Sequence, residues 1–105
     1  MADVDYVADV KRYDANADEA VVAAIVKHLG IALRSLDASL VSCSSKDELA
    51  RVRDSFAVKK LGLDAAKADP VISEICEEMK ADKRKQRVTF YYLLAKKTDT
   101  MSALS

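Results

Sequence analysis

The sequence predicts an all-α fold, a compact single-domain bundle of about five helices over residues 1–105. Only two glycines and one proline occur in the 105 residues, too few for the tight turns that an all-β domain needs. Half of the residues are hydrophobic, and they recur at intervals of three and four, which is the spacing of one helix face. A chain of this length can bury one small core.

The stretch from Ser45 to Leu63 carries the plainest helix signals in the chain. Ser45 and Glu48 have the spacing of a capping box, in which each side chain satisfies an amide of the first turn. Apolar residues then recur at helical spacing through Phe56. Gly62 stands where a left-handed residue would end the helix, with Leu63 placed to fold back on it. We expect an amphipathic helix of about four turns.

Two helices are expected before this central one. Val4 to Tyr13 has apolar residues at helical spacing and acids near its start, where the helix dipole favours them. Asn16, with Glu19 three residues later, offers a second capping-box-like start. That second helix is predicted to end at Gly30. Residues 31–44 are expected to form a connector containing one short helix.

Two helices are expected after the central one. Residues 64–68 look like a link, after which Asp69 is predicted as the N-cap and Pro70 as the first helical residue. The run Val88–Leu94 suits a buried strand as well as a helix. No other part of the sequence offers a strand partner, so we predict a helix that is buried nearly all round. The tail 98–105 is polar and small and is expected to fray.

The net charge and the sorting signals indicate where the protein is located and which partners it attracts. Seventeen basic residues balance seventeen acidic ones, so no global field draws the chain toward nucleic acid or an acidic membrane. The longest apolar run, residues 20–26, is too short to cross a bilayer, and no signal peptide is evident at the start. We expect a cytoplasmic protein without membrane contact. Cys43 and Cys76 form no C-x-x-C pair and are expected to be free thiols.

One local charge asymmetry offers a candidate binding patch near the end of the chain. Its residues are Lys80, Lys83, Arg84, Lys85 and Arg87. Phe90, Tyr91 and Tyr92 follow directly, and phosphate contact combined with aromatic stacking is typical of single-stranded nucleic-acid binding. The alternative is a solvated helix start whose aromatic side chains build the core, and the overall charge favours it. The same cations could also meet acids near the N-terminus, within one molecule or between two copies.

No pattern of catalytic or metal-binding residues stands out. His28 is the only histidine, whereas a zinc site draws on three or four protein ligands, so we interpret it as a residue at the edge of the core. A Cys–His dyad using Cys43 or Cys76 would be the enzymatic alternative, but neither cysteine has neighbours that lower a thiol pKa. There is no G-x-S-x-G motif and no Gly-rich phosphate loop. We therefore expect no cofactor, no metal and no enzymatic activity.

Several short motifs together resemble one protein family. The residues that carry the likeness are Leu36–Ser39, Glu48 and Leu49, Val52, Phe56, Lys59–Leu63 and Tyr91–Leu94. They resemble the pattern of domain-of-unknown-function family 2853, a family of small bacterial proteins, over most of the chain from about Tyr6 to Lys97. The resemblance implies a compact all-helical domain in a bacterial cytosol. It implies no activity and no functional residues.

The sequence thus favours a small non-catalytic binding or structural module. Its partner would be an unknown protein or a second copy of the chain. The alternative is weak nucleic-acid binding through residues 80–87, and a thiol enzyme has the least support.

Overall fold

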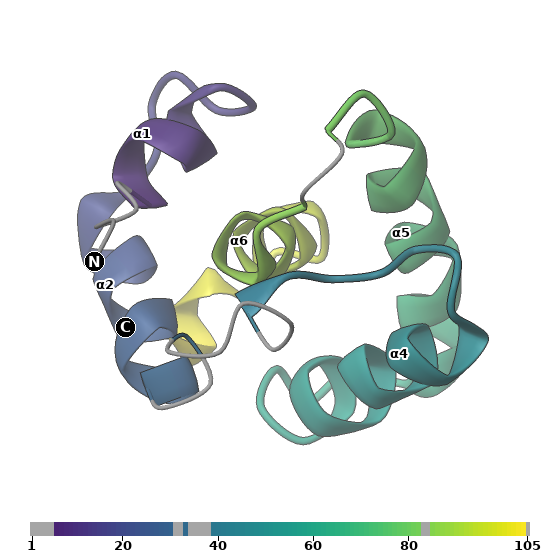
Figure 1. The fold of residues 1–105 in the computed structure, drawn as a ribbon. Helices are drawn as coiled ribbons and strands as arrows, with labels where there is room; N and C mark the ends of the chain where they lie inside the picture. The colour runs from purple at the N-terminus through teal and green to yellow at the C-terminus, as the bar shows by residue number, and fades with distance from the viewer. Residues whose placement is uncertain (1–5, 31–32, 34–38, 83–84, 105) are drawn as a thin grey trace.

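The protein folds as a bundle of helices (Figure 1). The computed structural model describes residues 6–30, 33, 39–82 and 85–104. Five α-helices lie within them: α1 (Tyr6–Lys11), α2 (Glu19–Leu29), α4 (Lys46–Arg51), α5 (Ala65–Glu78) and α6 (Arg87–Lys97). A π-helical segment, η2 (Val52–Val58), continues α4, and a 3-10 turn, η3 (Met101–Ala103), follows α6.

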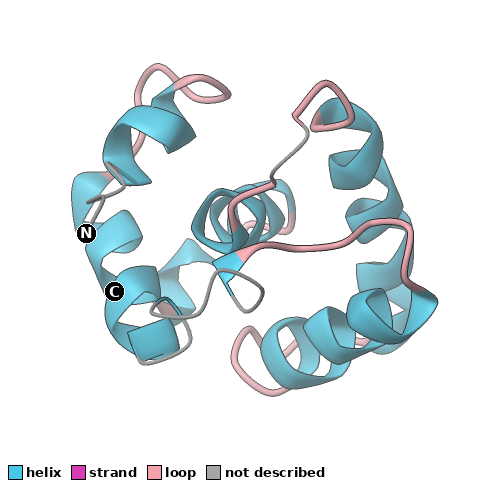
Figure 2. Ribbon diagram, viewed as in Figure 1, coloured by secondary structure: helices cyan, strands magenta, loops and turns pink. Residues whose placement is uncertain are grey.

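The all-α prediction is confirmed. No strand occurs in the described ranges, where loops join the helices directly (Figure 2). A single antiparallel bridge pairs Leu40 with Gln86. None of the helices in this part of the chain is long and apolar enough to cross a membrane.

Helix α6 is the centre of the bundle (Figure 1). It packs against α1 and α2 on one side and against η2 and α5 on the other. Nine consecutive residues, from Arg87 to Ala95, are buried, so the prediction of a helix buried all round is confirmed. Tyr91 and Tyr92 are only 4% and 1% exposed. The aromatic side chains of this segment therefore build the core and offer no surface for stacking a base.

The polar atoms of α6 hold the N-terminal part of the chain. The Thr89 hydroxyl donates a hydrogen bond to Asp9, and the Tyr92 hydroxyl donates one of 2.9 Å to Asp14. Lys96 lies 3.2 Å from the same Asp14 carboxylate. Burial alone would raise the pKa of Asp14, but the hydrogen bonds from Tyr92 and Lys96 outweigh it and lower that pKa. Asp9 and Asp14 therefore meet partners on α6 within the molecule.

At the start of the central helix, one of the two predicted capping-box hydrogen bonds is present. The Ser45 hydroxyl accepts a hydrogen bond of 3.2 Å from the Glu48 N–H, which confirms Ser45 as the N-cap. The Ser45 N–H donates to the Ser42 carbonyl, so the second bond of a capping box is replaced. The Glu48 carboxylate instead lies 2.5 Å from the Arg87 guanidinium. The Glu48 side chain therefore pairs with a residue distant in the sequence instead of capping its own helix.

The body of the central helix widens into a π-helix. The Leu61 N–H donates to the Phe56 carbonyl five residues back, and Phe56 and Ala57 are both buried. Gly62 adopts a left-handed conformation with φ of +73°, and the Leu63 N–H returns to the Ala57 carbonyl at 2.9 Å. The predicted stop at Gly62 is confirmed, because glycine has no Cβ to penalise this conformation.

Two predicted helix starts are wrong by a few residues. Asp18, and not Asn16, caps α2, with its carboxylate accepting from the Ala20 N–H at 3.0 Å. Asp64, and not Asp69, caps α5. Residues 65–68, predicted as a link, are helical, and Pro70 lies inside the helix. In each case an aspartate at the true boundary makes the same kind of cap, which the sequence alone could not rank.

The end of the chain differs from the expected frayed tail. Asp99 takes a left-handed conformation with φ of +56°, which aspartate tolerates better than most residues. The chain then turns back through η3, and Leu104 packs into the core with 5% of its surface exposed. The short helix predicted to begin at Asp37 lies outside the described residues.

Candidate functional site

The structure separates the members of the predicted basic patch. Arg87 points inward: its side chain is 11% exposed, pairs with Glu48, and donates to the Leu40 carbonyl at 2.9 Å. Lys83 and Arg84 lie outside the described residues. Lys80 and Lys85 stand at either end of the turn between α5 and α6, and both line one groove. The phosphate-binding role predicted for Arg87 therefore has no support from its position.

Asp82, which interrupts the basic run, fixes this turn to the residues that follow α1. Its carboxylate accepts hydrogen bonds of 2.5 Å from both Arg12 and the Tyr13 hydroxyl. The Lys85 ammonium donates to the Asp82 carbonyl at 3.0 Å, and the Val41 N–H donates to the Lys85 carbonyl at 2.8 Å. The turn that carries Lys80 and Lys85 is thus held from two sides.

These contacts shift the acid–base behaviour of both partners. Burial alone would raise the pKa of Asp82, but the hydrogen bonds from Tyr13 and Arg12 outweigh it, so the pKa lies below its usual value. Burial, reinforced by the hydrogen bond to Asp82, raises the pKa of Tyr13 to about 12. The charged form of Asp82 is therefore the form that stabilises the fold.

An acid-sensitive contribution to stability follows from this lowered pKa. A carboxyl group whose pKa is lower in the folded state stabilises above its unfolded pKa, near pH 4, and this contribution is lost as the pH falls further. We expect Asp82→Asn to lower the free energy of unfolding by roughly 1–2 kcal/mol at pH 7. At pH 2.5 the same substitution should change the free energy of unfolding much less. Urea denaturation at both pH values measures the two changes. Glu77→Gln, whose parent carboxylate is 77% exposed, is the control, and an equal loss at both pH values would contradict this assignment.

The two cysteines are joined in a disulfide between Cys43 and Cys76, with their Cα atoms 5.8 Å apart. The expectation of free thiols is therefore wrong for this state of the protein. It relied on the absence of a C-x-x-C pair, whereas the disulfide spans 33 positions of the sequence. The fold brings the segment before α4 against the last turns of α5, and this proximity leaves no local signal in the sequence.

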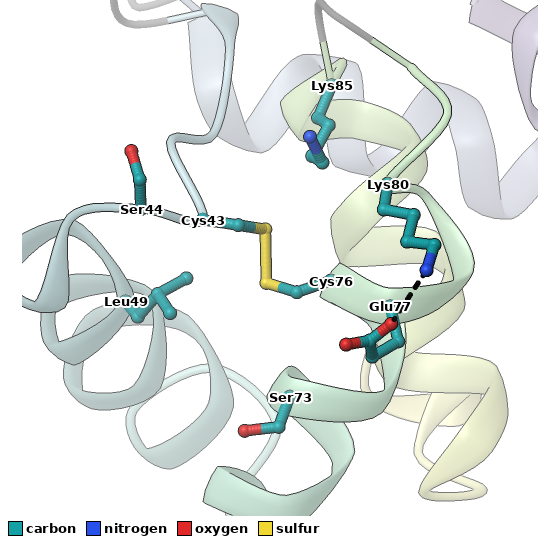
Figure 3. A pocket seen from close by; sticks show the side chains of 8 residues that line it. All are labelled: Cys43, Ser44, Leu49, Ser73, Cys76, Glu77, Lys80 and Lys85. Carbon is teal, nitrogen blue, oxygen red and sulfur yellow. Dashed lines mark ion pairs between the residues drawn. A yellow bond between two sulfur atoms is a disulfide. The ribbon is translucent and has the colours of Figure 1, made fainter.

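An open groove of about 530 Å³ lies beside the disulfide (Figure 3). The segment entering α4, α4 itself, α5 and the turn after α5 all contribute to it. The residues that line it are Cys43, Ser44, Leu49, Ser73, Cys76, Glu77, Lys80 and Lys85. Figure 3 shows Lys80 and Lys85 toward one end of the groove and Ser73 toward the other. Hydroxyl groups, two ammonium groups and a disulfide thus share one surface.

Lys80 and Glu77 in the groove are only weakly paired with each other. Lys80 lies 3.7 Å from Glu77, but both side chains are more than three-quarters exposed, and such a pair is worth little in water. The Ser44 and Ser42 hydroxyls lie 3.2 Å apart on the surface. Because two lysines and one glutamate line the groove, its net charge is positive and suits an anionic group.

The other candidate residues do not join this groove. His28 is exposed on α2 and touches the Phe56 ring at a centroid distance of 5.9 Å. Burial and the nearby Lys60 lower its pKa. It is not among the residues that line the groove, so a His28–cysteine dyad is not assembled there. In the ranges that the structure describes, no three His, Cys, Asp or Glu side chains cluster closely enough to hold a metal ion.

The chain matches a known protein family over nearly all of its length. The family model described as "Protein of unknown function (DUF2853)" matches residues 5–102. The chain belongs to this family. The resemblance seen in the sequence is thereby confirmed, and this DUF2853 domain has the all-helical fold that the resemblance implied. A search of curated proteins found no match to the chain in sequence.

Proposed function

We propose that this DUF2853 domain is a non-catalytic binding module and that the groove beside the disulfide receives an acidic segment of a partner protein. The observation that carries the proposal is an open groove of about 530 Å³ with two lysines and two serines in its lining. Most of the large apolar side chains are buried in the core. The groove, outside that core, brings ammonium, hydroxyl and disulfide groups together on one surface.

An acidic peptide suits this lining chemically. Carboxylates accept hydrogen bonds from ammonium and hydroxyl groups, and bonds that involve a charged group are the stronger ones. Lys80 is 78% exposed and can turn toward a ligand. Leu49 and the disulfide add apolar surface for the stems of the peptide's side chains. Recognition by shape and charge together needs no catalytic group.

Nucleic acid suits the same surface less well. Single-stranded binding without sequence preference relies on exposed aromatic rings, and Phe90, Tyr91 and Tyr92 are buried. Arg87 already has Glu48 as a partner. The balanced net charge of the chain adds no long-range attraction for phosphates. Nucleic acid would then be held by weak phosphate contacts with exposed cations such as Lys80.

Charge reversal at Lys80 tests the proposal. We expect Lys80→Glu to weaken binding of a fluorescently labelled Glu/Asp-rich peptide about fivefold to tenfold, because an attraction becomes a repulsion at the rim of the groove. Fluorescence anisotropy at low and at physiological salt measures the affinity, which should fall as salt rises. The fold should be unaffected, since the Lys80 side chain is largely in solvent.

Lys67→Glu is the matched control, because Lys67 is exposed on α5, does not line the groove, and gives the same change in net charge. Equal weakening by both substitutions would contradict a local site. Binding of a single-stranded oligonucleotide, without binding of the peptide, would favour the nucleic-acid alternative. Light scattering across protein concentration covers the remaining case, in which the partner is a second copy of the chain.

A further inference from the structure

We propose that the Cys43–Cys76 disulfide is a reversible thiol–disulfide exchange site whose substrates are small thiols that carry a carboxylate. The inference goes beyond peptide binding and does not depend on it. It rests on three features of the groove: access to the sulfur atoms, anchoring of both cysteines that does not need the disulfide, and positive charge beside them.

Access is the first requirement, because an attacking thiolate must reach a sulfur atom directly. Cys43 and Cys76 are each only partly buried, and both line the open groove. In Figure 3 the disulfide runs across the groove between the segment before α4 and α5. A structural disulfide sealed in a core would offer no such approach.

The segment that carries Cys43 is held in place by contacts of its own. The Val41 N–H donates to the Lys85 carbonyl at 2.8 Å, and Arg87 donates to the Leu40 carbonyl at 2.9 Å. Val41 itself is buried, with 4% of its surface exposed. None of these contacts involves sulfur, so they should outlast reduction of the disulfide.

Cys76 is held just as independently. It lies on α5, and Ile75 before it and Met79 at the helix C-cap are fully buried in the core. Both sulfurs should therefore stay close together after reduction, as a dithiol ready to close again. This preorganisation makes the couple reversible instead of a trigger for unfolding.

The exchange proceeds in two steps. A thiolate attacks one sulfur atom, a bond forms between the two, and the Cys43–Cys76 bond breaks with its electron pair leaving on the other cysteine as a thiolate that water protonates. A second thiolate then attacks the mixed disulfide at the sulfur of the small thiol. This step releases the small-molecule disulfide and the second cysteine thiol. Two thiols are oxidised and one protein disulfide is reduced, and the reverse sequence re-forms it.

Lys80 and Lys85 give the site its preference for thiols that carry a carboxylate. Both lysines line the groove that holds the disulfide, together with one opposing charge at Glu77, so an approaching anion meets a net positive charge and is attracted at short range. A thiol that carries an additional carboxylate charge gains more from this field than a neutral thiol of similar reactivity. Glutathione and 2-mercaptoethanol are suitable probes of the two kinds.

Reduction kinetics of the full chain test access and anchoring together. Samples taken during incubation with glutathione are quenched by alkylation, and intact mass counts the free thiols. We expect a rate proportional to thiol concentration and unchanged by low concentrations of urea, with the helical circular dichroism signal retained in the reduced protein. A rate that saturates with thiol and rises steeply with urea would show that reduction requires unfolding, and would overturn the proposal, as would loss of the helical signal.

The Lys80→Glu variant tests the preference for anionic thiols. We expect it to lower the ratio of the glutathione rate to the 2-mercaptoethanol rate about threefold at low salt, while Lys67→Glu leaves the ratio unchanged. An unchanged ratio in Lys80→Glu would overturn the assignment of the substrate class. The Cys43→Ser/Cys76→Ser double variant, measured by circular dichroism, shows directly whether the fold stands without the disulfide, and an unfolded double variant would overturn the proposal.

Discussion

Replacing Phe56 by alanine is expected to lower the free energy of unfolding by about 3–5 kcal/mol, the usual loss for an aromatic side chain in a core. Phe56 is 1% exposed. Its ring stacks on Tyr91 of α6 at a centroid distance of 3.8 Å and an interplanar angle of 15°. The substitution removes this contact and leaves a cavity between η2 and α6. A domain of this size has a total stability of roughly 5–15 kcal/mol, so the variant should be marginal.

Urea denaturation followed by far-ultraviolet circular dichroism measures this loss, and Phe56→Leu is the matched control. Leucine refills most of the volume but cannot stack, so it should cost about half as much or less. A loss below about 1 kcal/mol for Phe56→Ala would show that η2 does not pack on α6 as described.

Removing the Glu48 carboxylate is the second substitution with a large expected effect. Glu48 and Arg87 lie 2.5 Å apart, with side chains 17% and 11% exposed. In Glu48→Ala the Arg87 charge stays buried, and the Leu40 carbonyl and the Tyr91 hydroxyl still accept hydrogen bonds from its guanidinium. Breaking such a pair on one side commonly costs 3–5 kcal/mol. Because those two acceptors remain, we expect about 2–3 kcal/mol.

A double variant separates the pair from its surroundings. Glu48→Met combined with Arg87→Met replaces both charges by apolar side chains and should cost less than Glu48→Ala alone. Glu77→Ala, at an exposed carboxylate, controls for the loss of a negative charge and should change stability by less than about 0.5 kcal/mol. If Glu48→Ala behaves like Glu77→Ala, Arg87 is not buried as the structure has it.

The fold was largely predictable because its signals are local. Helical spacing, the Ser45 cap and the Gly62 stop each depend on residues within a few positions of one another, and each is confirmed. The errors arise where two neighbouring residues offer the same local chemistry. Asp64 and Asp69 could both cap α5, and only packing of the helix body, with Ala68 fully buried, distinguishes them.

The candidate site was less predictable because its parts are distant in sequence. The disulfide joins residues 33 positions apart, and the Glu48–Arg87 pair spans 39. The run of basic residues in the sequence predicted one binding patch for Lys80, Lys85 and Arg87. In the fold the two lysines line a groove, whereas the arginine points inward. No propensity or periodicity carries this information, since tertiary contact decides it.

The two proposals place different chemistry on one surface. Peptide binding uses the charge of the groove, and thiol exchange uses the sulfur atoms that form part of its lining. Disulfides are rare in reducing compartments and, where present, are mostly transient. A reversible couple is therefore compatible with the cytoplasmic location that the sequence led us to expect, which stays a prediction.

The most direct test of peptide binding in the groove is a titration of the isotope-labelled protein with the acidic peptide, followed by backbone amide chemical shifts. We predict that the shifts which change cluster at Cys43 and Ser44, at Ser73–Lys80 and at Lys85, while those of α1 and α2 stay constant. Changes centred on α1 or α2, or no change at peptide concentrations well above those used for anisotropy, would contradict it.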